Sequence, residues 1–127
     1  MTKFAFYGSL RAGMYNYSHW SEQLGLVDTI RIKGFIMKDF GPYPMCIESD
    51  CPEDSIVVDL MEVEDQGVAA SIDRMEKGAG YVPITITHNN IDYTMYIYEN
   101  DLHELRRVEG GDWKKYCDDK EEYKYSL

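Results

Sequence analysis

A short apolar run near the start of the chain, Phe4-Ala5-Phe6-Tyr7, ends abruptly at Gly8-Ser9. A strand with one face in water alternates apolar and polar residues, so this unbroken run predicts a strand that is buried on both faces and hydrogen-bonded on both sides. We therefore expect a central strand over residues 3–7 and a loop over residues 8–17. Such a loop exposes backbone N–H groups, and if a helix follows it, those donors can hold an anion.

An acidic residue in the middle of the chain, Glu76, stands at the end of a segment with helical periodicity. The spacing of Val68, Ile72 and Met75 gives one apolar stripe and predicts a helix over residues 64–77, ended by Gly78-Ala79-Gly80. The simplest interpretation of Glu76 is an exposed carboxylate in the last helical turn. A negative charge there opposes the helix dipole, however, so some other interaction should favour it. An anion-binding loop and one carboxylate suffice for proton transfer on an amino-acid-like substrate.

The remaining segments predict several short strands and few helices. A turn is expected at Gly41-Pro42-Tyr43-Pro44, because two prolines disfavour helix and sheet ladders, and His88-Asn89-Asn90 is expected to link the strands of a hairpin. The other predicted elements are a helix over residues 18–26, strands over 29–37, 55–63, 81–87 and 91–98, a helical turn over 102–108 and a charged, tyrosine-rich tail over 117–127. This pattern is typical of an α+β fold with a small mixed sheet or barrel flanked by helices.

Length, charge and cysteine content limit the class of protein. The chain has 127 residues, which predicts one domain over residues 1–127 with residues 118–127 as a surface tail. Its formal net charge of −10 argues against partners such as nucleic acid or an anionic membrane, which bind basic surfaces. The three cysteines cannot all pair within the chain and match no metal-site spacing, and no leader or long apolar run is apparent. We therefore expect free thiols and a cytoplasmic location.

Four short motifs follow one another along the chain: Tyr7-Gly8-Ser9-Leu10, Ile72-Asp73-Arg74-Met75-Glu76, Tyr81 and Gly111-Asp112-Trp113. Their order resembles that of the gamma-glutamylcyclotransferase-like superfamily, which includes the AIG2-like proteins. The resemblance extends from Phe4 to about Tyr116 and implies a compact barrel-like sheet flanked by helices, with a cavity at one end. We interpret Gly111-Asp112-Trp113 as a structural corner in which Asp112 accepts backbone N–H bonds.

The resemblance also implies a reaction. In this superfamily the α-amine of a gamma-glutamyl compound attacks its own γ-carbonyl, which gives 5-oxoproline and releases the attached amine. Glu76 matches the catalytic acid/base of the family. The substrate-binding residues that the resemblance implies are Tyr7, Gly8, Ser9 and Leu10, whose backbone would hold the substrate carboxylate, and the pocket tyrosines Tyr81 and Tyr98. The expected partner is a small-molecule gamma-glutamyl substrate, and neither a metal nor a cofactor is expected.

Three positions depart from the family pattern. Lys77 follows the catalytic Glu where Gly is common, Pro83 stands where Arg is frequent, and Val58-Asp59 replaces a common Gly-Glu pair. These departures leave a second interpretation open, in which the chain is a catalytically inactive ligand-binding or protein-interaction module of the same fold. The sequence also leaves open the leaving group and the oligomeric state. The two functional interpretations differ in whether Glu76 shares a cavity with Gly8 and Ser9.

Overall fold

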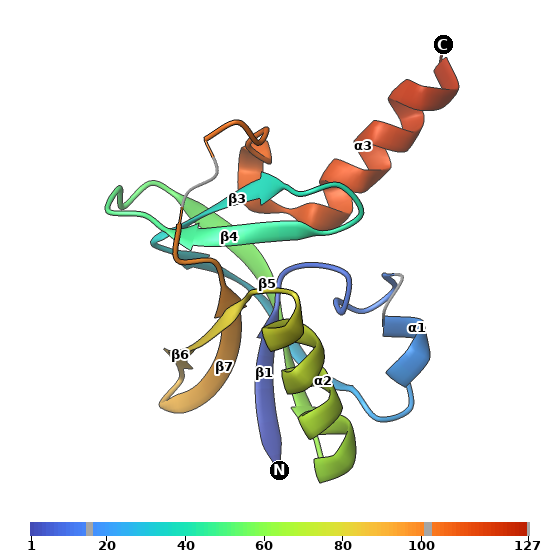
Figure 1. Ribbon diagram of the computed structural model, residues 1–127, viewed down its shortest axis with the longest axis vertical. Coiled ribbons are helices and arrows are strands. Elements are labelled where there is room, and N and C mark those ends of the chain that lie inside the picture. The colour runs from blue at the N-terminus through green and yellow to red at the C-terminus, as the bar shows by residue number, and fades with distance from the viewer. Residues whose placement is uncertain (15–16, 101–102, 127) are drawn as a thin grey trace.

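The computed structural model describes residues 1–14, 17–100 and 103–126, with side-chain environments up to residue 119. Its main element is a five-stranded mixed sheet with the strand order β2-β5-β1-β7-β6 (Figure 1). The strands, in that order, span Gly25–Lys33, Ser55–Val63, Thr2–Phe6, Ile91–Ile97 and Val82–His88. Together with the helices described below, this arrangement confirms an α+β fold. The sheet is open rather than closed into a barrel, because β2 and β6 are its two edges.

Strand β1 lies at the centre of this sheet, as the apolar run predicts. It pairs antiparallel with β5 and parallel with β7. Phe4, Ala5 and Phe6 are all buried, with Phe4 and Phe6 in one hydrophobic cluster and Ala5 in the other. Because both faces are covered, no polar residue is tolerated in the middle of the strand. The chain leaves this central position at Tyr7.

The predicted single strand over residues 29–37 is wrong, because the chain breaks at Gly34. Strand β2 ends at Lys33, and Gly34 has a φ of +94°, which only glycine adopts readily. The next residues form β3 (Phe35–Asp39), which pairs with β4 (Pro44–Glu48) in a separate two-stranded sheet. Pro44 was expected within a turn, yet it begins β4, since the first residue of a strand need not donate a ladder hydrogen bond.

Three further predictions need correction. The helix expected over residues 18–26 is only one turn long, α1 (Tyr17–Trp20), because β2 already begins at Gly25. The helical turn expected over residues 102–108 begins outside the described residues, and in residues 103–108 there is no helix but an isolated bridge from Arg107 to Lys38. Where a tail was expected from residue 117, helix α3 (Trp113–Ser126) follows the short 3-10 helix η1 (Glu109–Gly111) and extends away from the sheets (Figure 1).

Helix α3 begins at the predicted structural corner. The Asp112 carboxylate accepts a hydrogen bond from the Lys115 N–H at 3.3 Å, and the Asp112 carbonyl accepts one from the Tyr116 N–H. This confirms the expected role of Asp112 as an acceptor of backbone N–H bonds. The ring of Trp113 stacks on that of Tyr116 with centroids 5.4 Å apart and is itself buried. The corner therefore fixes the first turn of α3. The low hydrophobicity of this segment gives no indication of a helix in the sequence.

Helix α2 (Gln66–Gly78) agrees with the predicted helix to within two residues at its start. Asp65 caps it by accepting hydrogen bonds from the N–H groups of Gly67 and Val68. Its buried residues, Ala69 and Ile72, belong to the same cluster as Phe4 and Phe6, so α2 covers the face of the sheet on which these rings lie.

The hairpin of β6 and β7 is also confirmed. Asn89 and Asn90 both have positive φ values, as a tight two-residue turn requires.

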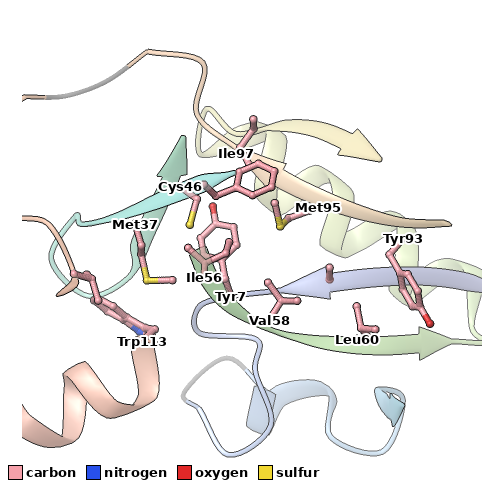
Figure 2. Close-up of a cluster of buried hydrophobic side chains, with 13 residues drawn as sticks. Tyr7, Met37, Cys46, Ile56, Val58, Leu60, Tyr93, Met95, Ile97 and Trp113 are labelled. Atoms are coloured by element: carbon pink, nitrogen blue, oxygen red, sulfur yellow. The ribbon is translucent and has the colours of Figure 1, made fainter. Parts of the chain in front are cut away.

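The second hydrophobic cluster lies on the opposite face. It joins Met95 and Val58 of the large sheet, and Tyr7 just after β1, to Met37 and Cys46 of the small sheet, with Trp113 at its edge (Figure 2). The two sheets therefore share one core, and the small sheet is held at the end where β1 gives way to its loop. In the parts of the chain that the structure describes, no helix is long and apolar enough to cross a membrane.

The packing of α2 leads to a stability prediction. Ile72 is completely buried, so Ile72→Ala should lower the free energy of unfolding by about 2 to 5 kcal/mol through lost transfer energy and an unfilled cavity. The same substitution at Ile91, which is 40% exposed, should cost less than about 1 kcal/mol. Chemical denaturation of both variants measures the difference. Equal losses would contradict the assignment of Ile72 as the residue that docks α2.

Candidate active site

A cavity of about 270 Å³ opens between the end of β1, the C-terminal turn of α2 and the start of β4. Its size lies near the lower end of the range for small-molecule sites. Of the residues predicted to act on a substrate, the cavity is lined by Tyr7, Gly8, Ser9, Leu10, Glu76 and Tyr81. Glu76 therefore shares a cavity with the Gly8-Ser9 loop, which is the arrangement that separates the two interpretations of the sequence.

The loop after β1 is a tight turn rather than the start of a helix. The Arg11 N–H donates to the Gly8 carbonyl at 3.0 Å, and the Tyr17 N–H donates to the Ser9 carbonyl at 3.1 Å. Among the residues described, the N–H groups of Gly8 and Leu10 donate no hydrogen bond. Unpaired N–H groups beside a cavity are donors available to an anionic ligand. Helix α1 is too short and too late in the chain to add a helix terminus to this site.

Gly8 is required by a close approach of Pro44. A Cβ atom placed on Gly8 would lie 2.8 Å from the Cδ atom of Pro44, closer than carbon atoms pack. The missing side chain lets the β4 end of the small sheet contact the loop directly. Glycine at position 8 therefore allows two walls of the cavity, the loop and Pro44, to pack against each other. The requirement for glycine here is steric and does not come from a positive φ.

A buried ionic network holds the far side of this loop. Asp59 of β5 is completely buried and accepts a hydrogen bond from the Ala12 N–H at 2.9 Å. Arg11, also buried, lies 3.4 Å from Asp59 and donates to Asp112 at 2.9 Å. Because a buried charge without a counter-charge is costly, Arg11 and the two carboxylates fix the loop relative to β5 and α3. Asp59 thus supplies a buried carboxylate at a position where the residue type departs from the family pattern.

Glu76 lies in the last turn of α2 with its carboxyl half-buried in the cavity wall. Burial raises the pKa of this carboxyl from its ordinary value of 4.5 to about 7. Within the described part of the chain, no side chain or backbone group forms a hydrogen bond or ion pair with it. A carboxyl group with a pKa near neutrality and no protein partner can both accept and return a proton.

The preceding turn of α2 is fixed by Asp73. The Tyr96 hydroxyl donates to the Asp73 carboxylate at 2.7 Å, and Lys77 lies 3.0 Å from its other oxygen. The hydrogen bond from Tyr96, followed by that from Lys77, holds the pKa of Asp73 below its ordinary value. This contact ties α2 to β7 one turn before Glu76, so it sets the direction in which Glu76 faces.

The predicted pocket tyrosines occupy different positions. Tyr81 lines the cavity, and its hydroxyl donates to the Pro44 carbonyl at 2.7 Å. Burial raises the pKa of Tyr81 above its ordinary value. Tyr98 is not among the lining residues: its ring packs on Tyr81 with centroids 4.6 Å apart, and its hydroxyl donates to the Ala79 carbonyl. Tyr7 lines the cavity, but its buried hydroxyl donates to the Tyr96 carbonyl at 2.6 Å.

Seven lining residues were not predicted as site residues: Ala5, Phe6, Tyr43, Pro44, Met75, Ala79 and Tyr96. Tyr96 could have been found from the period of two in a strand, because it stands two residues before Tyr98 in the strand predicted over residues 91–98. Met75 was assigned to the apolar stripe of the helix, and Tyr43 to a turn. In the residues that the structure covers, no group of three or more His, Cys, Asp or Glu side chains could hold a metal ion.

Comparisons with known proteins agree with this architecture. A model of the family described as gamma-glutamyl cyclotransferase, AIG2-like, matches residues 4–115. A comparison with curated proteins found no match. An uncharacterised protein of Pyrococcus horikoshii is 18% identical with a TM-score of 0.79, over 96% of this chain and 98% of that one. The protein ytfP of Escherichia coli is 25% identical with a TM-score of 0.70, over 88% and 96%.

The same fold also occurs as part of a much larger protein. An allophanate hydrolase of Kluyveromyces lactis is 12% identical with a TM-score of 0.72, over 94% of this chain but only 21% of that one. At this identity, the likeness concerns the fold alone.

The raised pKa of Glu76 predicts a pH-dependent effect on stability. Between pH 4.5 and about 7 the unfolded chain loses this proton while the folded protein keeps it, so ionisation progressively destabilises the folded state. Glu76→Gln should therefore be more stable than the parent by about 1 to 2 kcal/mol at pH 8, after allowing for partial solvation, and about equal to it at pH 4. Urea unfolding at both pH values, with the exposed Glu53→Gln as a control, measures this. A difference independent of pH would contradict the raised pKa.

Proposed function

Because the chain belongs to the gamma-glutamyl cyclotransferase, AIG2-like family, we propose that it converts a gamma-glutamyl amine or amino acid into 5-oxoproline and the released amine. The observation that carries this proposal is the shared cavity of Glu76 and the loop of residues 7–10. Glu76 acts as the general acid/base, and the loop binds the carboxylate of the glutamyl group.

Binding of the glutamyl end follows from the loop geometry. The N–H groups of Gly8 and Leu10 donate to the substrate α-carboxylate, and Ser9 contributes its hydroxyl. Tyr81 forms the apolar wall against the carbon chain of the glutamyl group, and Tyr98 supports that ring from behind. A ligand held in this way keeps its α-amine and its γ-carbonyl in the same small cavity, so the entropy cost of bringing them together is already met on binding.

In the reaction, two protons move from the α-nitrogen of the substrate to the leaving nitrogen. The ionised Glu76 takes a proton from the substrate α-ammonium, and the amine so formed attacks the γ-carbonyl carbon to close the five-membered ring. Glu76 then gives its proton to the leaving nitrogen as the original carbon–nitrogen bond breaks. The ring nitrogen then loses its second proton. The released amine accepts this proton and leaves as an ammonium ion. A carboxyl group with a pKa of about 7 serves in both directions near neutral pH.

The wider setting of the reaction is part of the same proposal. We propose one catalytic domain over residues 1–127, with residues 118–127 as a surface segment, acting in the cytoplasm without a metal or cofactor. The net charge of −10 supports a small-molecule partner rather than nucleic acid or a membrane surface. In the described part of the chain none of the three cysteines forms a disulfide, which is consistent with a reducing compartment.

The direct test is the release of 5-oxoproline from a panel of gamma-glutamyl compounds by the purified protein. We expect Glu76→Gln to lower kcat by roughly 10²- to 10⁴-fold with a much smaller change in KM, because Gln keeps the size but cannot transfer a proton. Glu53→Gln, which changes an exposed carboxyl outside the cavity, is the matched control. Turnover that survives in Glu76→Gln would remove this residue from the mechanism. Binding of 5-oxoproline without any turnover by the parent protein would support a ligand-binding module instead.

The pH dependence provides an independent prediction. Only the ionised Glu76 accepts the first proton, so kcat/KM should rise with pH and level off above about pH 7. The residual activity of Glu76→Gln should lack this limb. A limb near pH 4.5 in the parent protein, or one that persists in the variant, would assign the titration to another group.

A further inference from the structure

The opening of the cavity differs in character from its floor. Buried apolar residues such as Phe6 and Leu10 line its depth. The large lining side chains with the greatest exposure are Tyr43, at 40%, and Met75, at 37%. Large apolar side chains that reach solvent beside a cavity are typical of a contact surface for a ligand. Tyr43 and Met75 therefore mark the rim at which the outer part of a bound molecule lies.

Tyr43 belongs to an ordered aromatic wall. Its ring is 6.0 Å from that of Phe40, which meets Tyr98 edge-to-face at 5.5 Å, and Tyr98 in turn packs on Tyr81 at 4.6 Å. The turn that carries it is closed by the Phe40 N–H donating to the Tyr43 carbonyl, and Pro44 is held by the Tyr81 hydroxyl. These rings are pre-positioned, so a ligand group that packs on Tyr43 does not have to order the wall first.

The rim also lacks positive charge. Across the described residues, no Lys, Arg or His lines the cavity. The nearest cation in sequence to the catalytic carboxyl, Lys77, is directed to Asp73 at 3.0 Å. The loop of residues 7–10 provides one set of anion-binding donors, which the glutamyl carboxylate occupies. A second carboxylate on the leaving group would therefore find no counter-charge at the rim. It would also be repelled by the negative field of a protein with a net charge of −10.

From the apolar rim and the absence of a second anion site, we propose that the leaving group is an amine with an apolar or aromatic body and no carboxylate, seated against Tyr43 and Met75. This inference rests on the proposed cyclotransferase function and narrows its substrate class. An aromatic ring on the leaving amine stacks on Tyr43 and contacts the thioether of Met75. Tyr43 and Met75 are thus specificity-determining residues that do not take part in proton transfer.

A matched pair of substrates tests the charge argument. The phenethylamide of glutamate, linked through its γ-carboxyl, and γ-glutamylphenylalanine differ only by the carboxylate beside the scissile nitrogen. We expect kcat/KM for the phenethylamide to be higher by about tenfold or more, in the range by which a pocket discriminates one unfavourable group. The γ-methylamide, which has no ring, should be poorer than the phenethylamide.

A charge introduced at the rim should reverse the preference. Met75→Lys places an ammonium beside the leaving group, so we expect kcat/KM for γ-glutamylphenylalanine to rise relative to that for the phenethylamide by about tenfold. Val27→Lys makes the same change in net charge at an exposed site on β2 outside the cavity, and it should leave the ratio unchanged. Thermal melting of both variants verifies that they are folded.

The outcomes separate the two proposals. Release of 5-oxoproline from both parent substrates at equal kcat/KM, or faster release from γ-glutamylphenylalanine, would overturn the specificity inference and leave the cyclotransferase function standing. Release from none of the three substrates would overturn the function and the inference together. If Met75→Lys does not fold, the ratio of the matched pair in the parent protein decides by itself.

Discussion

The docking of α2 on the sheet face formed by β1 and β5 is the interaction on which the site depends. Ile72 is completely buried in the cluster that contains Phe4 and Phe6 of β1, and the helix ends at Gly78, fewer than two turns later. This places the C-terminal turn of α2 beside the point at which β1 becomes a loop. A carboxyl group in that turn and the N–H groups of that loop then face one cavity, although they are far apart in the sequence.

The position of Glu76 has an energetic cost that the surrounding structure offsets. A carboxylate at a helix C-terminus opposes the helix dipole, and its half-buried environment disfavours the charge further. The helix is nevertheless held in place by the Asp65 cap at its start and by the contact from Tyr96 to Asp73 near its end. Residues that are unfavourable for stability but retained in a cavity are characteristic of functional sites.

Much of this arrangement could be predicted from local sequence. The apolar run of β1, the helical stripe of α2 and the paired asparagines of the hairpin each have a direct physical cause that acts within a few residues. The split of β2 and β3 at Gly34 could not be predicted, because Gly34 falls in the same alternation as Ile30 and Ile32 and apolar residues follow it directly. The same holds for β4, since Pro44 suggests a turn until its partner strand is known. Helix α3 depends on the Asp112 corner, which involves contacts rather than helical periodicity.

The candidate site divides in the same way. Glu76 and the loop of residues 7–10 were identified from motifs, and the structure brings them together. Tyr96 lines the cavity whereas Tyr98 does not, and the rim residues Tyr43 and Met75 come from a turn and a helix whose relative positions only the fold determines. The central claim is that this geometry gives one carboxyl group the proton affinity of a general acid/base. Carbon-13 NMR titration of the Glu76 side-chain carboxyl, assigned by comparison with Glu76→Gln, tests it most directly. A midpoint near pH 7 is the predicted result, and a midpoint near 4.5 would contradict the account.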